Sequence, residues 1–204
     1  MIANTPIDTR HFIRKENYME QAKNNKVLVV VDMQNDFITG SLGSKEAQAI
    51  VDAVVQRIID FDGLILYTLD THTSDYLNTK EGQKLPVEHC IAGTEGWAPN
   101  AAVWMALMHK NVADEQHMIA KDTFGGVSLP MRIHELLDGN EPESIDLVGL
   151  CTDICVISNA LLVKAFYPEA TITVDAAACA GATPEGHKTA LSAMKTCHID
   201  IVNE

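Results

Sequence analysis

The sequence predicts an α/β protein of three layers, with helices on both faces of a central, mostly parallel sheet. Short runs of β-branched and leucine residues, such as KVLVVVD (26–32) and LILYTLD (64–70), are typical of strands buried on both faces. Segments with the apolar spacing of helices lie between these runs. Such an alternation of strands and helices favours a parallel sheet covered on both faces.

In the amino-terminal half, the first strand is expected at 26–32 and is followed by a helix at 44–60. Ser44 suits its N-cap. Its apolar residues recur at helical spacing and share one face: Ile50, Val51, Val54, Val55, Ile58 and Ile59. The strand 64–70 comes next, then a loop-rich section to about residue 96 and a helix at 97–110.

In the carboxyl-terminal half, a short strand at 117–122 precedes a helix at 128–139, where Gly139 suits the residue that ends a helix. A strand at 144–150 leads into a helix at 153–166. The remaining elements are a strand at 171–178, a helix at 183–197 and a last strand at 198–203. Thr183 and Pro184 suit the cap and first position of that helix.

The chain has 204 residues, a length that suits one domain with a full core. We interpret residues 26–204 as that domain and residues 1–25, which are polar and lack clear periodicity, as an N-terminal arm. No apolar run reaches the roughly 20 residues of a membrane span, and the start of the sequence has no continuous apolar segment of the kind found in signal peptides.

Charge and cysteine content narrow the expected partners and compartment. The net charge of −13 argues against nucleic acid and anionic membranes, since both favour basic patches. The five cysteines are odd in number and scattered, which is poor evidence for a disulfide framework. Free cysteines fit a reducing compartment, so we expect a cytoplasmic protein.

Chemically active side chains stand where the predicted strands end. Asp32 closes the first strand, Lys121 the third, and the fourth runs into Cys151 and Cys155. Ligands of such sheets bind beyond the carboxyl ends of the strands, so we expect these side chains to meet there. Cys155 lies near the start of a predicted helix, which lowers a thiol pKa. Asp32 and Lys121 would supply a base and a positive field.

The two cysteines also allow other interpretations. They are separated as CxxxC, which disfavours a redox couple because such couples use CxxC. Free cysteines are most often small buried hydrophobic residues. Asp32 would then cap the following turn, and Lys121 would extend to the surface at a strand end.

A second group of polar residues follows the strand 64–70. Asp70 and His72 are two positions apart and can share one face, and His89 returns after a loop that contains Glu81. Two histidines and a carboxylate with open positions form a usual catalytic set for Zn²⁺ or Fe²⁺. The alternative is a polar loop that faces water.

Several segments together resemble one known family. VVVDMQNDF, AKDTFGG and GLCTDICV match the three signature segments of the isochorismatase-like cysteine hydrolases. DTH followed by HCIAGTEG is similar to the metal segment of the nicotinamidase/pyrazinamidase branch. The resemblance covers roughly residues 26–203 in order.

This resemblance implies a catalytic triad of Asp32, Lys121 and Cys155. Cys155 would be the nucleophile, Asp32 would take its proton and later give one to the departing ammonia, and Lys121 would stabilise charge and orient Asp32. The backbone N–H groups of Cys151 and Cys155 would form the oxyanion hole. Family members carry a cis peptide bond that would fall here between Leu150 and Cys151.

The resemblance also implies a divalent metal ion held by Asp70, His72 and His89, with Glu81 as a further ligand or a contact to water. Zn²⁺ is the expected ion, with Fe²⁺ or Mn²⁺ as alternatives, and in nicotinamidases it binds the pyridine nitrogen of the substrate. The expected substrate pocket has these residues: Phe37, Phe124, Leu150 and Cys151. Members of the family are commonly dimers or tetramers, so a homo-oligomer is expected.

The implied activity is hydrolysis of nicotinamide, or a close aromatic amide, to the acid and ammonia through a thioester. Two positions depart from the nicotinamidase pattern: Pro86 stands where many members have tryptophan, and DTFGG replaces a YSAF-like segment. An amidase for ureido or carbamoyl compounds is an alternative, although those branches generally lack the metal set. A non-catalytic binding protein of the same fold is another, and a true isochorismatase is disfavoured by the retained cysteine.

Overall fold

The computed structural model describes residues 24–204, so the arm predicted for residues 1–25 lies outside the described residues except for its last two positions. Six strands form one sheet in the order β3-β2-β1-β4-β5-β6. Every neighbouring pair in this sheet is parallel. The strands are β1 (Lys26–Val31), β2 (Leu64–Asp70), β3 (Met118–Lys121), β4 (Ser144–Leu150), β5 (Thr171–Ala180) and β6 (Asp200–Val202).

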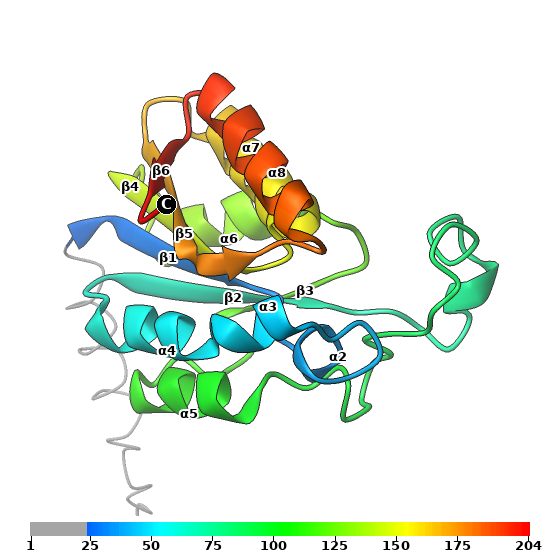
Figure 1. The fold of residues 1–204 in the computed structure, drawn as a ribbon. Coiled ribbons are helices and arrows are strands. Elements are labelled where there is room, and N and C mark those ends of the chain that lie inside the picture. The colour runs from blue at the N-terminus through cyan, green and yellow to red at the C-terminus, as the bar shows by residue number, and fades with distance from the viewer. Residues whose placement is uncertain (1–23) are drawn as a thin grey trace, which may run out of the picture.

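Helices cover both faces of the sheet and produce three layers (Figure 1). One face carries α2 (Asn35–Ile38), α3 (Lys45–Ala49), α4 (Val51–Asp60) and α5 (Ala101–His109). The other face carries α6 (Leu129–Leu136), α7 (Ile157–Phe166) and α8 (Pro184–Thr196). Each face has its own apolar cluster, and β1 contributes alternate residues to both. This arrangement confirms the predicted fold class.

Local sequence explains where several helices begin. The Ser44 side chain accepts a hydrogen bond from the N–H of Ala47, and Thr183 accepts one from Gly186, so both are the predicted N-caps. The single helix expected at 44–60 is instead divided at Ile50 into α3 and α4. The helix expected from residue 97 begins only at Ala101, because Asn100 caps it through the N–H of Ala102.

The carboxyl end of β4 requires a residue without a side chain. Gly149 has a φ of +117°, and a Cβ there would lie 2.1 Å from the carbonyl oxygen of Val31 on β1. Only glycine allows the two strands to approach so closely at this point. The peptide bond between Leu150 and Cys151, one residue further on, is cis, as the family resemblance implied.

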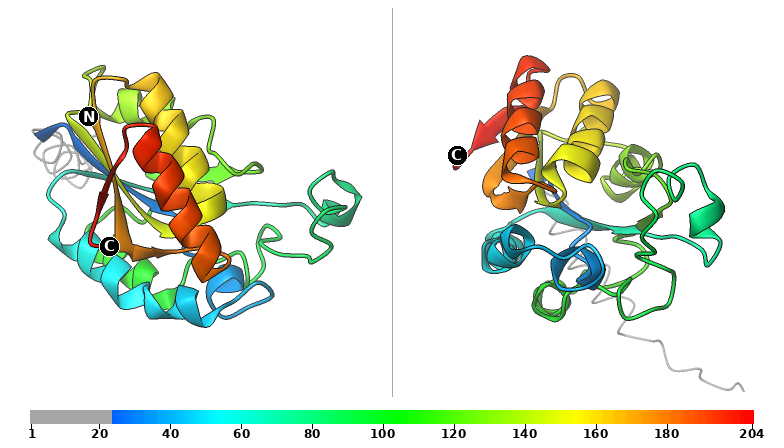
Figure 2. Two further views of the ribbon diagram at one scale, coloured as in Figure 1. Left: turned by 45° about the horizontal axis from the view of Figure 1, so that its top comes forward. Right: turned by 45° about the vertical axis from the view of Figure 1, so that its right-hand side comes forward.

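Two irregular segments extend from the carboxyl ends of the strands. After β2, the chain leaves the body of the molecule, forms the 3₁₀ helix η2 (Tyr76–Asn78) and returns (Figure 2). After β4, a π-helical turn, η3 (Thr152–Val156), leads into α7. The helix predicted at 153–166 is therefore a π-helical turn followed by an α-helix. Among the described residues, no helix has the length and apolar character needed to cross a membrane.

Candidate active site

The structure brings Asp32, Lys121 and Cys155 together at the carboxyl edge of the sheet. The Lys121 Nζ lies 2.7 Å from Oδ2 of Asp32 and 3.6 Å from Sγ of Cys155. Asp32 follows β1, Lys121 ends β3, and Cys155 lies in η3 after β4. All three side chains are buried, and Asp32 is 0% exposed. An acid, a cation and a thiol therefore lie together in one buried cluster, as their positions at the strand ends predicted.

Thr68 of β2 fixes the orientation of the Asp32 carboxylate. Its hydroxyl donates a hydrogen bond to Oδ1 of Asp32 at 2.6 Å, and the Asp32 N–H points back to Oγ1 of Thr68 at 3.2 Å. Asp32 has a φ of +48°. One carboxylate oxygen thus faces Thr68 and the other faces Lys121, and this leaves the carboxylate little freedom to rotate.

Burial sets the protonation state of the site. It raises the pKa of Asp32 above its usual value, and the neighbouring charge of Lys121 opposes that shift without cancelling it. Burial, followed by the Asp32 carboxylate, raises the pKa of the Cys155 thiol, whereas the sequence favoured a lowered one. Burial works to lower the pKa of Lys121, but the charge of Asp32 outweighs it and the ammonium form is retained. The environment of Cys155 therefore favours its thiol form over the thiolate.

A second cluster adjoins the first. One ligand atom each from Asp70, His72 and His89 lies within 4.8 Å of the others, and all three residues are buried. Oδ2 of Asp70 is 3.0 Å from Nε2 of His72 and 3.4 Å from Nε2 of His89. Lys121 joins the two clusters, because its Nζ is also 3.4 Å from Oδ1 of Asp70.

These three residues fit a divalent metal ion in their donor chemistry. Nδ1 of His89 lies 2.8 Å from the carbonyl oxygen of Val87, and a proton on Nδ1 leaves the Nε2 lone pair free to bind a metal. Nε2 of His72 is buried and lacks a partner with hydrogen-bond geometry among the described residues. Two imidazole nitrogens and a carboxylate that converge with open lone pairs form a set suited to zinc.

Electrostatics within the cluster also favour a cation. Burial works to raise the pKa of Asp70, but the adjacent His72, His89 and Lys121 outweigh it, and its pKa lies well below the usual range. Glu81 stands further out, with Oε1 3.8 Å from Nε2 of His72 and 3.9 Å from Nε2 of His89. Asp70 is therefore ionised at neutral pH. Glu81 lies at the limit of ion-pair distance from both histidines.

The expected pocket residues differ in their exposure. Phe37 is buried, and its ring centroid lies 5.6 Å from that of His89. Leu150 is fully buried and Cys151 is half-buried. Phe124 is 48% exposed, so its ring is not buried as that of Phe37 is. Tyr76, which the sequence did not single out, packs against the rings of His72 and His89 with centroids 4.6 and 4.8 Å away.

Two buried amides missed by sequence reasoning hold this site together. The Gln34 side chain accepts from the N–H of Asp70 and donates to its carbonyl oxygen, both at 2.8 Å. Asn159 of α7 accepts from the N–H of Gly126 at 2.9 Å and donates to the Cys155 carbonyl at 2.8 Å. A fully buried amide must find such partners, and no periodic pattern in the sequence marks either residue.

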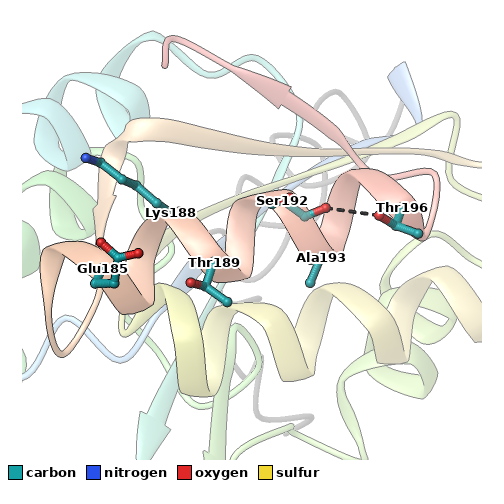
Figure 3. A pocket seen from close by; sticks show the side chains of 6 residues that line it. All are labelled: Glu185, Lys188, Thr189, Ser192, Ala193 and Thr196. Carbon is teal, nitrogen blue, oxygen red and sulfur yellow. Dashed lines mark hydrogen bonds between the residues drawn. The ribbon is translucent and has the colours of Figure 1, made fainter.

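The surface also has a pocket that is separate from these clusters. It lies along α8, and Figure 3 shows the side chains that line it: Glu185, Lys188, Thr189, Ser192, Ala193 and Thr196. None of the predicted site residues is among them. This pocket is therefore formed by α8 residues and not by the strand ends.

Comparisons with known proteins agree with this geometry. The isochorismatase family protein PncA of Bacillus subtilis is 29% identical over 177 residues, which cover 82% of this chain and 92% of that protein. A crystal structure of nicotinamidase/pyrazinamidase PncA from Bacillus subtilis has a TM-score of 0.72 and 25% identity, and covers 87% of this chain and 99% of its own.

A third relative is described with a metal. The pyrazinamidase of Pyrococcus horikoshii in complex with zinc has a TM-score of 0.68 and 27% identity, over 88% of this chain and 99% of that one. The family model described as the isochorismatase domain matches residues 26–203, nearly all of the described chain. The chain therefore belongs to the isochorismatase family.

Proposed function

We propose that this protein is a metal-assisted cysteine amidohydrolase that converts nicotinamide, or a close aromatic amide, to the acid and ammonia. The observation that carries the proposal is the contact of Lys121 with Asp32, Cys155 and Asp70, which joins a nucleophile, a base and a metal-binding set in one buried site. The solved structures of nicotinamidases and pyrazinamidases that resemble this chain support the substrate class.

In the first half-reaction, Cys155 is the nucleophile. Asp32 takes the thiol proton as sulfur attacks the amide carbon, and it then delivers that proton to the departing nitrogen, which leaves as ammonia. A thioester between Cys155 and the acyl group remains. The raised pKa of Asp32 suits this exchange, because a general base and acid works best near the operating pH.

In the second half-reaction, water replaces ammonia. Asp32 removes a proton from the water as it attacks the thioester, and the proton returns to sulfur when the acid leaves. Each attack places negative charge on the carbonyl oxygen, and the backbone N–H groups of Cys151 and Cys155 are proposed to receive it. Lys121 stays positively charged throughout and stabilises the ionised forms of its neighbours.

Asp70, His72 and His89 are proposed to hold the metal ion, with Zn²⁺ as the expected species and Fe²⁺ or Mn²⁺ as alternatives. When bound, the ion supplies a Lewis acid for a ring nitrogen of the substrate. Glu81 borders this set and is proposed to contact a water molecule there. Phe37 and Phe124, with Leu150 and Cys151, are proposed to line the place of the aromatic ring.

The test is ammonia release from nicotinamide by the purified protein, before and after treatment with a chelator and after zinc is restored. We expect ammonia release by the wild type to fall on chelation and to recover with zinc. Ammonia release by a His72→Ala variant should stay low with and without zinc. A folded protein that releases no ammonia from nicotinamide, with or without zinc, would exclude this substrate. A parallel assay of ureido and carbamoyl compounds then tests the alternative amidase function.

We further propose a cytoplasmic homo-oligomer, either a dimer or a tetramer. The five cysteines are free thiols, which suit a reducing compartment. Met105 and Met108 of α5 are more than half exposed, and a second copy of the chain would cover them. Light scattering of the purified protein measures the mass directly, and a monomer at micromolar concentration would contradict the oligomer.

A further inference from the structure

The start of α8 packs against the turn that carries the proposed nucleophile. Oγ1 of Thr152 lies 2.8 Å from Nδ1 of His187. Thr152 follows Cys151 directly and is fully buried, whereas His187 is half-buried in the first turns of α8. A buried hydroxyl needs a partner, and His187 provides it from a helix more than thirty residues further along the chain.

Asp153, the next residue, is also hydrogen-bonded to the segment around the start of α8. Oδ1 of Asp153 accepts a hydrogen bond from the N–H of Ala182 at 2.9 Å. A Cβ at Gly186 would lie only 2.0 Å from Oδ2 of Asp153, so the glycine leaves room for the Asp153 carboxylate in this position. Thr152 and Asp153, two consecutive residues of the π-helical turn, are thus hydrogen-bonded to the first turn of α8 and to the loop before it.

The turn that these hydrogen bonds hold has an unusual backbone conformation. The carbonyl oxygen of Cys151 accepts from the N–H groups of Ile154, at 3.1 Å, and Val156, at 3.0 Å, within a π-helical turn. Turns of this kind are rare and occur mostly at functional sites. The relative placement of the Cys151 and Cys155 N–H groups depends on the residues between them, and Thr152 is the first of these.

We propose that His187 is a positioning residue for acyl transfer: through Thr152 it fixes the backbone between Cys151 and Cys155 so that both N–H groups meet the developing oxyanion. This inference rests on the proposed function. Among the described residues, the side chain of His187 is hydrogen-bonded to Thr152 and not to Cys155 or the metal-binding residues, so it is not a catalytic residue. With the imidazole proton on Nε2, Nδ1 accepts the hydrogen of the Thr152 hydroxyl.

The test combines two pairs of variants. His187→Ala and Thr152→Val remove the interaction from either side, while His187→Asn and Thr152→Ser retain a polar atom near the same place. His134→Ala, at an exposed position of α6, is the matched control. The readouts are kcat and KM for nicotinamide and for p-nitrophenyl acetate, an activated ester that also requires the thiol and oxyanion donors, together with urea unfolding of each variant.

We expect His187→Ala and Thr152→Val each to lower kcat about 10-fold with KM changed less than about twofold, a smaller loss than the ~10²–10³ of removing an oxyanion donor. The double variant should be no worse than either single one, because both remove the same contact. His187→Asn should recover most of the rate. Unchanged kcat in a folded His187→Ala, or losses that multiply, would overturn the proposal.

The use of two substrates distinguishes a failure of this inference from a failure of the proposed function. If the wild type cleaves the ester through Cys155 but not nicotinamide, the substrate assignment fails while the ester still tests His187. If a folded wild type cleaves neither, both proposals are overturned. A His187→Ala variant that is less stable to urea but keeps its ester kcat would show a structural role only, and this also overturns the inference.

Discussion

At the scale of single residues, the two buried carboxylates of the site are tuned in opposite directions. Asp32 is surrounded by protein and burial raises its pKa, with one ammonium group beside it. Asp70 is also buried, but two imidazoles and the same ammonium group lower its pKa. Different environments thus suit Asp32 to proton transfer and Asp70 to holding a cation.

Asp32→Asn tests the first of these roles. The amide keeps the size of the side chain and a partner for Thr68, but it cannot accept the thiol proton. We expect kcat to fall about 10²–10⁴-fold, the usual contribution of a general base. The free energy of unfolding should also fall, because Lys121 loses its nearest buried ion-pair partner, so kcat is compared under conditions in which the variant is folded. Asp52→Asn, on the exposed side of α4, is the control. A folded Asp32→Asn variant with kcat within threefold of wild type would contradict the role.

His187 makes the free energy of unfolding depend on pH, and the environment of its imidazole sets the sign of that dependence. Burial lowers its pKa in the folded protein; Asp153 and Glu204 oppose this shift and Lys188 adds to it. The unfolded chain therefore binds the proton first, and the free energy of unfolding decreases as pH falls through the ordinary histidine value of about 6.5. We expect a shallower decrease between pH 7 and 5 in His187→Asn than in wild type, measured by urea unfolding. Equal slopes would contradict this assignment.

The sequence indicated Asp32, Lys121, Cys155, Asp70 and His72, because each stands at or shortly after a strand end. His89 was indicated by its type and by the resemblance of its segment to a metal segment. Thr68, Gln34 and Asn159 were not anticipated. Each of them has a hydrogen-bond partner 33 to 36 residues away in sequence. A hydrogen bond between distant elements leaves no periodic pattern, so such supporting residues are found only once the chain is folded.

At the scale of elements, β4 leads into the turn that contains Cys155, and its pairing with β1 depends on Gly149. Gly149→Ala would force a Cβ against Val31 at a positive φ, and we expect a loss of about 3 kcal/mol or more in the free energy of unfolding. Gly93→Ala is the matched control, because Gly93 also has a positive φ but nothing lies within 4 Å of its Cβ position. There we expect about 1 kcal/mol. Similar losses at both sites in urea unfolding would show that contact with β1 is unimportant.

Strong local signals made most elements predictable. Continuous apolar runs fixed β1, β2 and β4, and the side chains of Ser44 and Thr183 fixed the starts of two helices. The break at Ile50 and the π-helical turn after Cys151 were not predicted. Apolar periodicity within 44–60 continues across the break, and a π-helical turn has a composition that also suits an α-helix.

At the scale of the whole molecule, metal binding should link the segment after β2 to global stability. Asp70 ends β2 while His72 and His89 lie beyond it, so an ion bound by all three joins these parts in the folded state only. A ligand at 100 times its Kd stabilises by ~2.7 kcal/mol. We expect zinc to raise the Tm of chelator-treated wild type and to leave that of His72→Ala nearly unchanged. Equal shifts in both proteins would contradict the assigned ligands.

Cys155, which lies beside Lys121 in a chain of the isochorismatase family, is proposed to be the nucleophile of an amidohydrolase. The most direct test compares Cys155→Ala with Cys151→Ala in ammonia release from a panel of small amides that begins with nicotinamide and pyrazinamide. We predict that release falls to background in folded Cys155→Ala, whereas Cys151→Ala retains turnover because only its backbone is needed. Turnover that persists in Cys155→Ala, or is lost only in Cys151→Ala, would contradict the account.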